Sequence, residues 1–173
     1  FVAHGESSVP RNFYRFIKSL HNCLTGKWHH RFNERHVEEA LAIGEVAYAA
    51  GYLFWSGYAR LERGDFDEAQ KIVDRLDEIG KRYNYAHSNF YYYSLASKLF
   101  INTNALAKAE ACVDAAIHQL VAYGLDMRRI EFYGLKMKTS ILQNDLKAAQ
   151  KIVIKGDDLI SKIGKKSILP NYY

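Results

Sequence analysis

Apolar residues recur along most of the chain at spacings of three and four, which is the period of an amphipathic α-helix. In the first such stretch the apolar residues share one face and the pattern ends at Gly26; these residues are Phe13, Phe16, Ile17, Leu20 and Leu24. Proline occurs only as Pro10 and Pro170, so the sequence between them lacks the residue that breaks helices. The pattern predicts an all-α fold.

One pattern occurs three times, at intervals of forty residues, in residues 64–69, 104–109 and 144–149. The apolar positions of the three copies coincide: Leu61, Ile101 and Ile141; Phe66, Leu106 and Leu146; Ala69, Ala109 and Ala149; Val73, Val113 and Val153. A repeat of this length predicts a stacked array of two-helix units, each of which buries its outer face against the next. The recurring alanine offers a notch where two antiparallel helices approach closely.

We expect helical hairpins at about 11–50, 51–80, 85–124 and 126–164, which together form one repeat domain over 11–164. The second helix of the first hairpin should run through Val46 and Ala47 and end before Gly51, and the next helix should start at Tyr52. Glycine should close three hairpins, at Gly80, Gly124 and Gly164, and Asp65 should cap the helix that begins beside it. Residues 1–10 are expected to be a linker or tail, and residues 165–173 a C-terminal tail.

Composition narrows the class of protein. The formal charge is +5, with a pI near 9.1, but basic and acidic residues alternate along nearly the whole chain, which favours a solvated helical surface over a nucleic-acid interface. The longest apolar run, Val46 to Trp55, is too short to cross a bilayer, which takes about 20 residues. Cys23 and Cys112 lie far apart and outside any ligand spacing, as expected of buried thiols in a reducing compartment. Without an initiating methionine or a signal-peptide pattern, we expect a piece of a longer cytoplasmic protein.

The first copy, Gly64-Asp65-Phe66-Asp67-Glu68-Ala69, resembles the tetratricopeptide repeat family in its Gly-x-(aromatic or Leu)-x-x-Ala turn, with Gly57 at the small position of the preceding helix. The resemblance covers about 51–164. Asn104 and Asn144 replace the turn glycine, no proline closes a unit, and the period exceeds the usual 34 residues, so the chain looks like the forty-residue variant of large bacterial regulatory and signalling proteins. The resemblance implies a right-handed superhelix of about four stacked antiparallel hairpins.

The same resemblance implies a concave groove that binds a partner protein or peptide. By register, Tyr58, Lys98 and Lys138 would be equivalent groove positions, joined by Phe54, Tyr91, Asn102 and Glu131. Two lysines beside aromatic rings would suit an acidic extended segment, or a helix that carries a carboxylate. The alternative is that these residues are ordinary surface or packing residues.

No catalytic, cofactor or metal motif stands out. His29, His30 and His36 invite a metal hypothesis, but the acids near them have the spacing of ordinary helix-surface residues. No nucleophile–base pair, carboxylate pair or glycine-rich phosphate loop is recognisable, which predicts a non-enzymatic role. Three functions stay open: a protein-interaction module, a sensor that binds a small molecule or peptide around Tyr58, Tyr91 and Tyr92, and self-association through exposed end helices.

Overall fold

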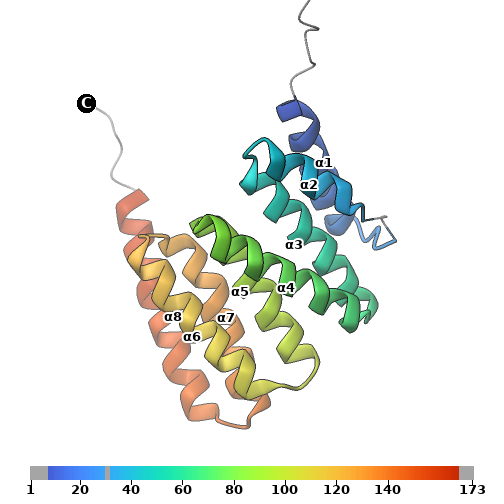
Figure 1. Ribbon diagram of the computed structural model, residues 1–173. Coiled ribbons are helices and arrows are strands. Elements are labelled where there is room, and N and C mark those ends of the chain that lie inside the picture. Colours follow the sequence, from blue (N-terminus) through green and yellow to red (C-terminus); the bar gives the residue numbers. More distant parts are fainter. Residues whose placement is uncertain (1–7, 30–31, 168–173) are drawn as a thin grey trace, which may run out of the picture. The chain divides into compact units, whose positions relative to one another are not determined.

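The computed structural model describes residues 8–29 and 32–167 (Figure 1). Within these residues the chain is all-helical, which confirms the predicted fold class. The described residues form eight α-helices and no strand: α1 (Ser8–Leu24), α2 (Glu34–Ala42), α3 (Val46–Arg63), α4 (Phe66–Tyr83), α5 (Ala86–Asn102), α6 (Leu106–Ala122), α7 (Asp126–Leu142) and α8 (Leu146–Ser167).

The helices fall into two compact units, Phe1–Leu95 and Ala96–Tyr173, whose boundary lies within α5. In the first unit α3 packs against α1, α2 and α4. Its fully buried side chains include Val37, Leu53, Leu76, Ile79 and Leu95. In the second unit α7 packs against both α6 and α8, and the fully buried side chains include Val113, Ala116 and Phe132. Each unit thus has an apolar core of its own.

The helices from α3 to α8 begin at intervals of twenty residues, half the period found in the sequence. Their first residues are Val46, Phe66, Ala86, Leu106, Asp126 and Leu146. Two residues before each start, the backbone is left-handed, with φ between 44° and 79°; these residues are Gly44, Gly64, Asn84, Asn104, Gly124 and Asn144. Glycine and asparagine are the residues that adopt this conformation most readily. One helix and one turn therefore make the smallest repeating element.

Five of the six turns use the same hydrogen bond. The amide after the left-handed residue donates to the carbonyl five residues earlier, at N···O distances of 2.8–3.0 Å, in the pairs Glu45–Ala40, Asp65–Arg60, Ala105–Phe100, Leu125–Leu120 and Asp145–Ser140. This is the bond of the Schellman motif, which satisfies a carbonyl left unpaired at a helix end. In the sixth turn the left-handed residue itself is the donor: the Asn84 amide donates to the carbonyl of Gly80, four residues earlier, at an N···O distance of 2.9 Å.

The first hairpin differs from the prediction in where its helices end. The second helix stops at Ala42, because Gly44 turns the chain, and Val46 and Ala47 already belong to α3. Gly51 is therefore not a boundary: it lies inside α3, where a Cβ atom would come within 2.5 Å of the Phe16 ring of α1. The predicted helix start at Tyr52 is wrong for the same reason.

Three other boundaries need correction. α1 begins at Ser8, so Pro10 stands in its first turn, where proline is tolerated. Gly80 and Gly164 do not close helices, since α4 continues to Tyr83 and α8 to Ser167. The remainder of the two expected tails, residues 1–7 and 168–173, lies outside the described residues. Gly124 does end its hairpin as predicted.

The predicted cap at Asp65 is also wrong in detail. Asp65 precedes α4 but makes no side-chain cap hydrogen bond, because its carboxylate pairs with Arg63. At the third copy of the turn, Asp145 does cap: its Oδ1 accepts from the Ala148 amide at 2.8 Å.

Candidate functional site

Three of the predicted groove residues form one aromatic cluster in the first unit. The ring of Phe54 in α3 lies 5.0 Å from that of Tyr91 in α5 and 6.3 Å from that of Tyr58, measured between centroids. Phe54 is only 5% exposed, whereas Tyr58 and Tyr91 are half-buried. Phe54 is therefore the buried member of the cluster, and the two tyrosines supply its accessible surface.

The cluster also contains the only two tryptophans of the chain, which the repeat register did not predict. Trp55 lies 4.9 Å from Phe54 and 6.0 Å from Tyr58, and Trp28 lies 6.2 Å from Tyr58. The buried Nε1 of Trp55 has no hydrogen-bond acceptor among the described residues. Trp28 stands in the connection between α1 and α2, outside the repeats, so no register could align it with the others.

The predicted groove residues of the second unit divide into a pair and two exposed side chains. Lys98 in α5 forms an ion pair with Glu131 in α7, and the two side chains are 24% and 35% exposed. Asn102 and Lys138 are exposed. Lys98 thus already has an acidic partner within the chain, Glu131, which balances its charge. The expected interaction of both lysines with an acidic partner protein would have to compete with this ion pair.

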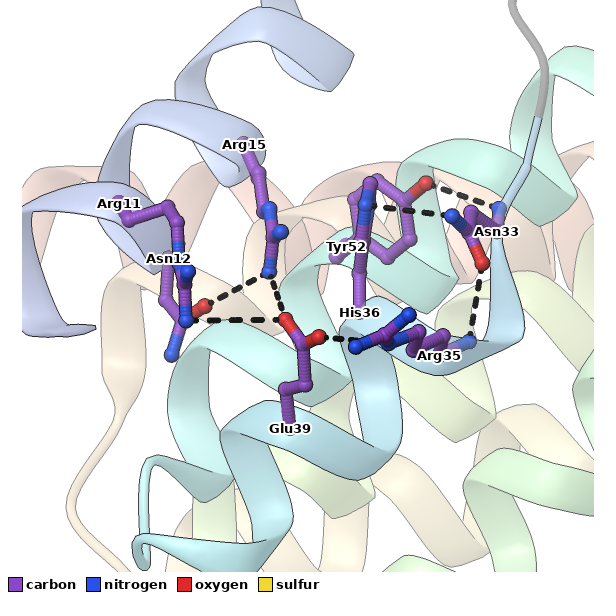
Figure 2. A network of polar contacts seen from close by, with 8 residues as sticks. All are labelled: Arg11, Asn12, Arg15, Asn33, Arg35, His36, Glu39 and Tyr52. Atoms are coloured by element: carbon purple, nitrogen blue, oxygen red, sulfur yellow. Dashed lines mark hydrogen bonds and ion pairs between the residues drawn. The ribbon is translucent and has the colours of Figure 1, made fainter.

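A polar network in the first unit was not foreseen (Figure 2). Glu39 of α2 accepts from Arg15 of α1 at 2.7 Å and from Arg35 at 2.9 Å, and Arg11 lies 3.8 Å from the same carboxylate. The hydrogen bond from Arg15, with the positive charges of Arg15 and Arg11, lowers the pKa of Glu39. Because these contacts link α1 to α2, the network stabilises the packing of the two helices of the first hairpin.

The same network includes one of the histidines considered for metal binding. The His36 ring lies 5.6 Å from that of Tyr52, and its Nε2 is 3.3 Å from the Asn33 side-chain nitrogen. The Tyr52 hydroxyl accepts from the Asn33 amide at 3.1 Å, and burial raises the pKa of this phenol. Across residues 8–29 and 32–167 no three His, Cys, Asp or Glu side chains are grouped as metal ligands, and His30 lies outside that range.

Both cysteines are free and buried, as expected from the sequence. The Cys23 thiol donates to the Trp55 carbonyl at an S···O distance of 3.1 Å. Burial raises the pKa of Cys23 to about 11 and also raises that of Cys112, so both stay protonated near neutrality. Neither thiol has the character of a nucleophile.

Two hollows flank the contact between α7 and α8 in the second unit, and Tyr133 lines both. One, of about 400 Å³, is lined mainly by charged residues: Arg129 pairs there with Asp126 at 2.8 Å, beside the exposed Lys155 and Lys162. The other, of about 210 Å³, is lined mainly by apolar side chains and by two glycines. The two glycines are Gly134 of α7 and Gly156 of α8.

No helix in the described part of the chain is both long and apolar enough to span a membrane. Compared with protein-family models, with curated proteins and with solved structures, the chain matches none. Its function must therefore be inferred from the side chains and surfaces described above.

Proposed function

We propose that the chain is a non-catalytic protein-interaction module, a tetratricopeptide-like right-handed array of stacked hairpins that belongs to a cytoplasmic regulatory or signalling protein. The observation that carries the proposal is the twenty-residue interval at which six successive helices begin, each after a left-handed residue. Arrays of this kind repeat one structural element to present an extended surface to a partner. Two buried, protonated thiols are compatible with a reducing compartment.

The partner-facing residues in this proposal are those of the predicted groove that stay accessible. Tyr58 and Tyr91 offer ring surface, and Asn102 and Lys138 are exposed. Rings with a polar tip bind protein surfaces well because they bury a large area while the tip keeps a hydrogen bond. Phe54 packs against both tyrosine rings.

The test is capture of partners from a lysate of the source cell, with the native chain and a Lys138→Glu variant as baits. Lys138 is exposed, so the variant should keep the native circular dichroism spectrum. Lys18→Glu is the matched control, since Lys18 is also exposed and lies in α1, outside the predicted groove and the aromatic cluster. We expect the native bait and the control bait to retain a partner protein that the Lys138→Glu variant loses. Equal retention by all three baits would contradict the proposal that the partner binds in the groove.

A second candidate, a sensor for a small molecule or peptide, is favoured by one observation. The unpartnered Nε1 of Trp55 lies among rings, so it could donate to an acceptor on a bound ligand. Because both tryptophans belong to the cluster, intrinsic fluorescence reports on it directly. Titration with metabolite mixtures should then shift the emission of the native chain and leave a Tyr58→Ala variant unchanged; an emission that no mixture alters would argue against sensing.

A further inference from the structure

The apolar hollow between α7 and α8 is an open groove whose walls come from both helices. Most of its lining is apolar or glycine, from Ile130, Gly134 and Met137 of α7 and from Val153, Gly156 and Ile160 of α8. Tyr133 and Ile152 also line it, and Asp157 is the one charged residue of the lining. Val153 is 43% exposed and Ile160 is 51% exposed. Branched apolar side chains so exposed on one continuous face are typical of a surface that another element covers.

The two glycines distinguish this groove from the interior of the molecule. A Cβ atom on Gly134 or Gly156 would meet nothing within 4 Å. On Gly51, Gly57 or Gly80 it would come within 2.4–2.5 Å of a side chain from another helix. Glycine weakens a helix, and at those three positions it makes room for a neighbour. At Gly134 and Gly156 the same kind of room exists and no described side chain fills it.

The repeat indicates what kind of element fits there. Forty residues before Val153, Gly156 and Ile160 stand Val113, Ala116 and Leu120 of α6, all at most 3% exposed. α6 packs against α7, so the face that these residues share is one that accepts a helix. The groove on α8 therefore has the form of a helix-binding face without its helix.

Charge indicates which helix. Residues 126–167 contain ten basic residues (Lys and Arg) and five acidic ones (Asp and Glu). The rest of the chain has fourteen basic and fourteen acidic residues. The whole net charge of +5 therefore lies on the two helices that form the groove and on the turn between them. A second copy that docked through its own α7 and α8 would bring the same positive charge against the groove and be repelled. An acidic partner would be attracted, and its association would be faster at low salt.

We propose that the α7–α8 groove binds an amphipathic, acidic helix of a partner protein, which lays its apolar face over Gly134 and Gly156. This site uses none of the seven groove residues predicted from the sequence. It can therefore exist whether or not the proposed function at those residues is correct.

The test uses a fluorescein-labelled synthetic peptide of about 20 residues, roughly 30 Å long as a helix. It has leucine at helical spacings of three and four and mainly glutamate elsewhere. One control peptide carries lysine in place of each glutamate, and another has the composition of the acidic peptide in an order without an apolar face. Measured by fluorescence anisotropy with the full chain, the acidic peptide should bind at least tenfold more tightly than either control. Equal binding of the acidic and lysine peptides would overturn the charge argument.

A groove variant separates binding at this site from binding elsewhere. Gly156→Leu should fill the floor of the groove and weaken the acidic peptide at least tenfold, while the melting temperature stays equal or rises because the position faces open space. Ser161→Leu, at an exposed position of α8 that does not line the groove, is the matched control and should bind like the native chain. Undiminished binding by a folded Gly156→Leu variant would place the peptide elsewhere and overturn the proposal.

Sedimentation velocity identifies the competing occupant. A native chain that is monomeric across the concentration range of the binding experiment is the expected result. A dimer that Gly156→Leu dissociates would show that the groove is occupied by a second copy, and the assignment to an acidic partner would fall.

Discussion

At the scale of single residues, the recurring alanine is a buried position in all three copies of the pattern. Ala69 and Ala109 are fully buried and Ala149 is 6% exposed, as expected of the notch between paired helices. Ala109→Trp should therefore lower the free energy of unfolding by about 1–3 kcal/mol or more, because an overpacked core must shift its neighbours. Urea denaturation measures the loss, and Ala107→Trp, at an exposed position of the same helix, should leave the midpoint nearly unchanged. Equal stability of the two variants would show that residue 109 is not a packing position.

Cys23 links burial to a pH dependence at the same scale. Burial raises the pKa of its thiol from an ordinary value of 9.0 to about 11, so the folded state holds the proton more tightly than the unfolded chain does. The stability that this contributes is complete below pH 9 and is lost as the pH rises towards 11. Between pH 8 and pH 10 the loss should be about 1.4 kcal/mol.

The measurement is the difference between the native chain and Cys23→Ser, which removes the background of other titrations. Serine can keep the hydrogen bond to the Trp55 carbonyl but does not ionise in this range. The native chain should lose stability relative to the variant as the pH rises. Parallel stability curves for the two proteins would mean that Cys23 ionises in the folded state as easily as in the unfolded chain.

At the scale of helices, two glycines in helix interiors should respond in opposite directions to the same substitution. Gly57→Ala gains helix propensity, but its Cβ would come within 2.4 Å of Leu95 Cδ2 and 3.0 Å of Ile72 Cγ2, so we expect a net loss of about 1–3 kcal/mol. Gly134→Ala meets nothing within 4 Å and should gain up to about 1 kcal/mol. Thermal unfolding monitored by circular dichroism compares the two variants, and a shift of the same sign in both would contradict the difference in packing.

Helix type and the forty-residue interval were predictable because they follow from apolar spacing, but the twenty-residue interval was not recognised. Its signal was present in Gly44 and Asn84, which hold the same left-handed position as the turn of the first copy. Gly44 was missed because apolar residues flank it on both sides and continue the helical pattern. Asn84 was missed because the residue five places on is Asn89, where the three copies of the forty-residue pattern have alanine.

The candidate sites show the same limit. Tyr58 and Tyr91 were named from the register that the repeat gives the first helix of each unit, and the structure brings both rings near Phe54. The Lys98–Glu131 pair was missed because it depends on the lateral register of α5 and α7, across 33 positions of the chain, which no periodicity encodes. The groove between α7 and α8 was missed because an exposed glycine and a buried one look alike in a sequence.

At the scale of the whole molecule, burial is distributed unevenly along the repeats. The third copy of the pattern leaves Ile141, Leu146 and Val153 between 43% and 65% exposed, whereas Leu61, Ile101, Val73 and Val113 of the earlier copies are at most 6% exposed. In repeat proteins stability is nearly a sum of the contributions of individual repeats and of the contacts between neighbours. The hairpin of α7 and α8 should therefore open at a lower free energy than the helices that precede it.

Amide hydrogen exchange tests this gradient directly. α4 buries six residues, so its amides should exchange only through large openings. The described side chains of α8 include three buried ones, Ala149, Ile152 and Leu159. The amides of α8 should therefore exchange at least tenfold faster than those of α4, a difference of about 1.4 kcal/mol or more in opening free energy. Gly156→Ala is the control within the element, since it stabilises α8 alone and should slow its exchange without altering that of α4. If the two helices exchanged at equal rates and slowed together in the variant, the chain would unfold as a single cooperative body. Faster exchange confined to α7 and α8 would show that this hairpin opens independently of the rest of the chain. A helix bound in its groove would then stabilise the least stable part of the molecule, so that binding and local folding are linked.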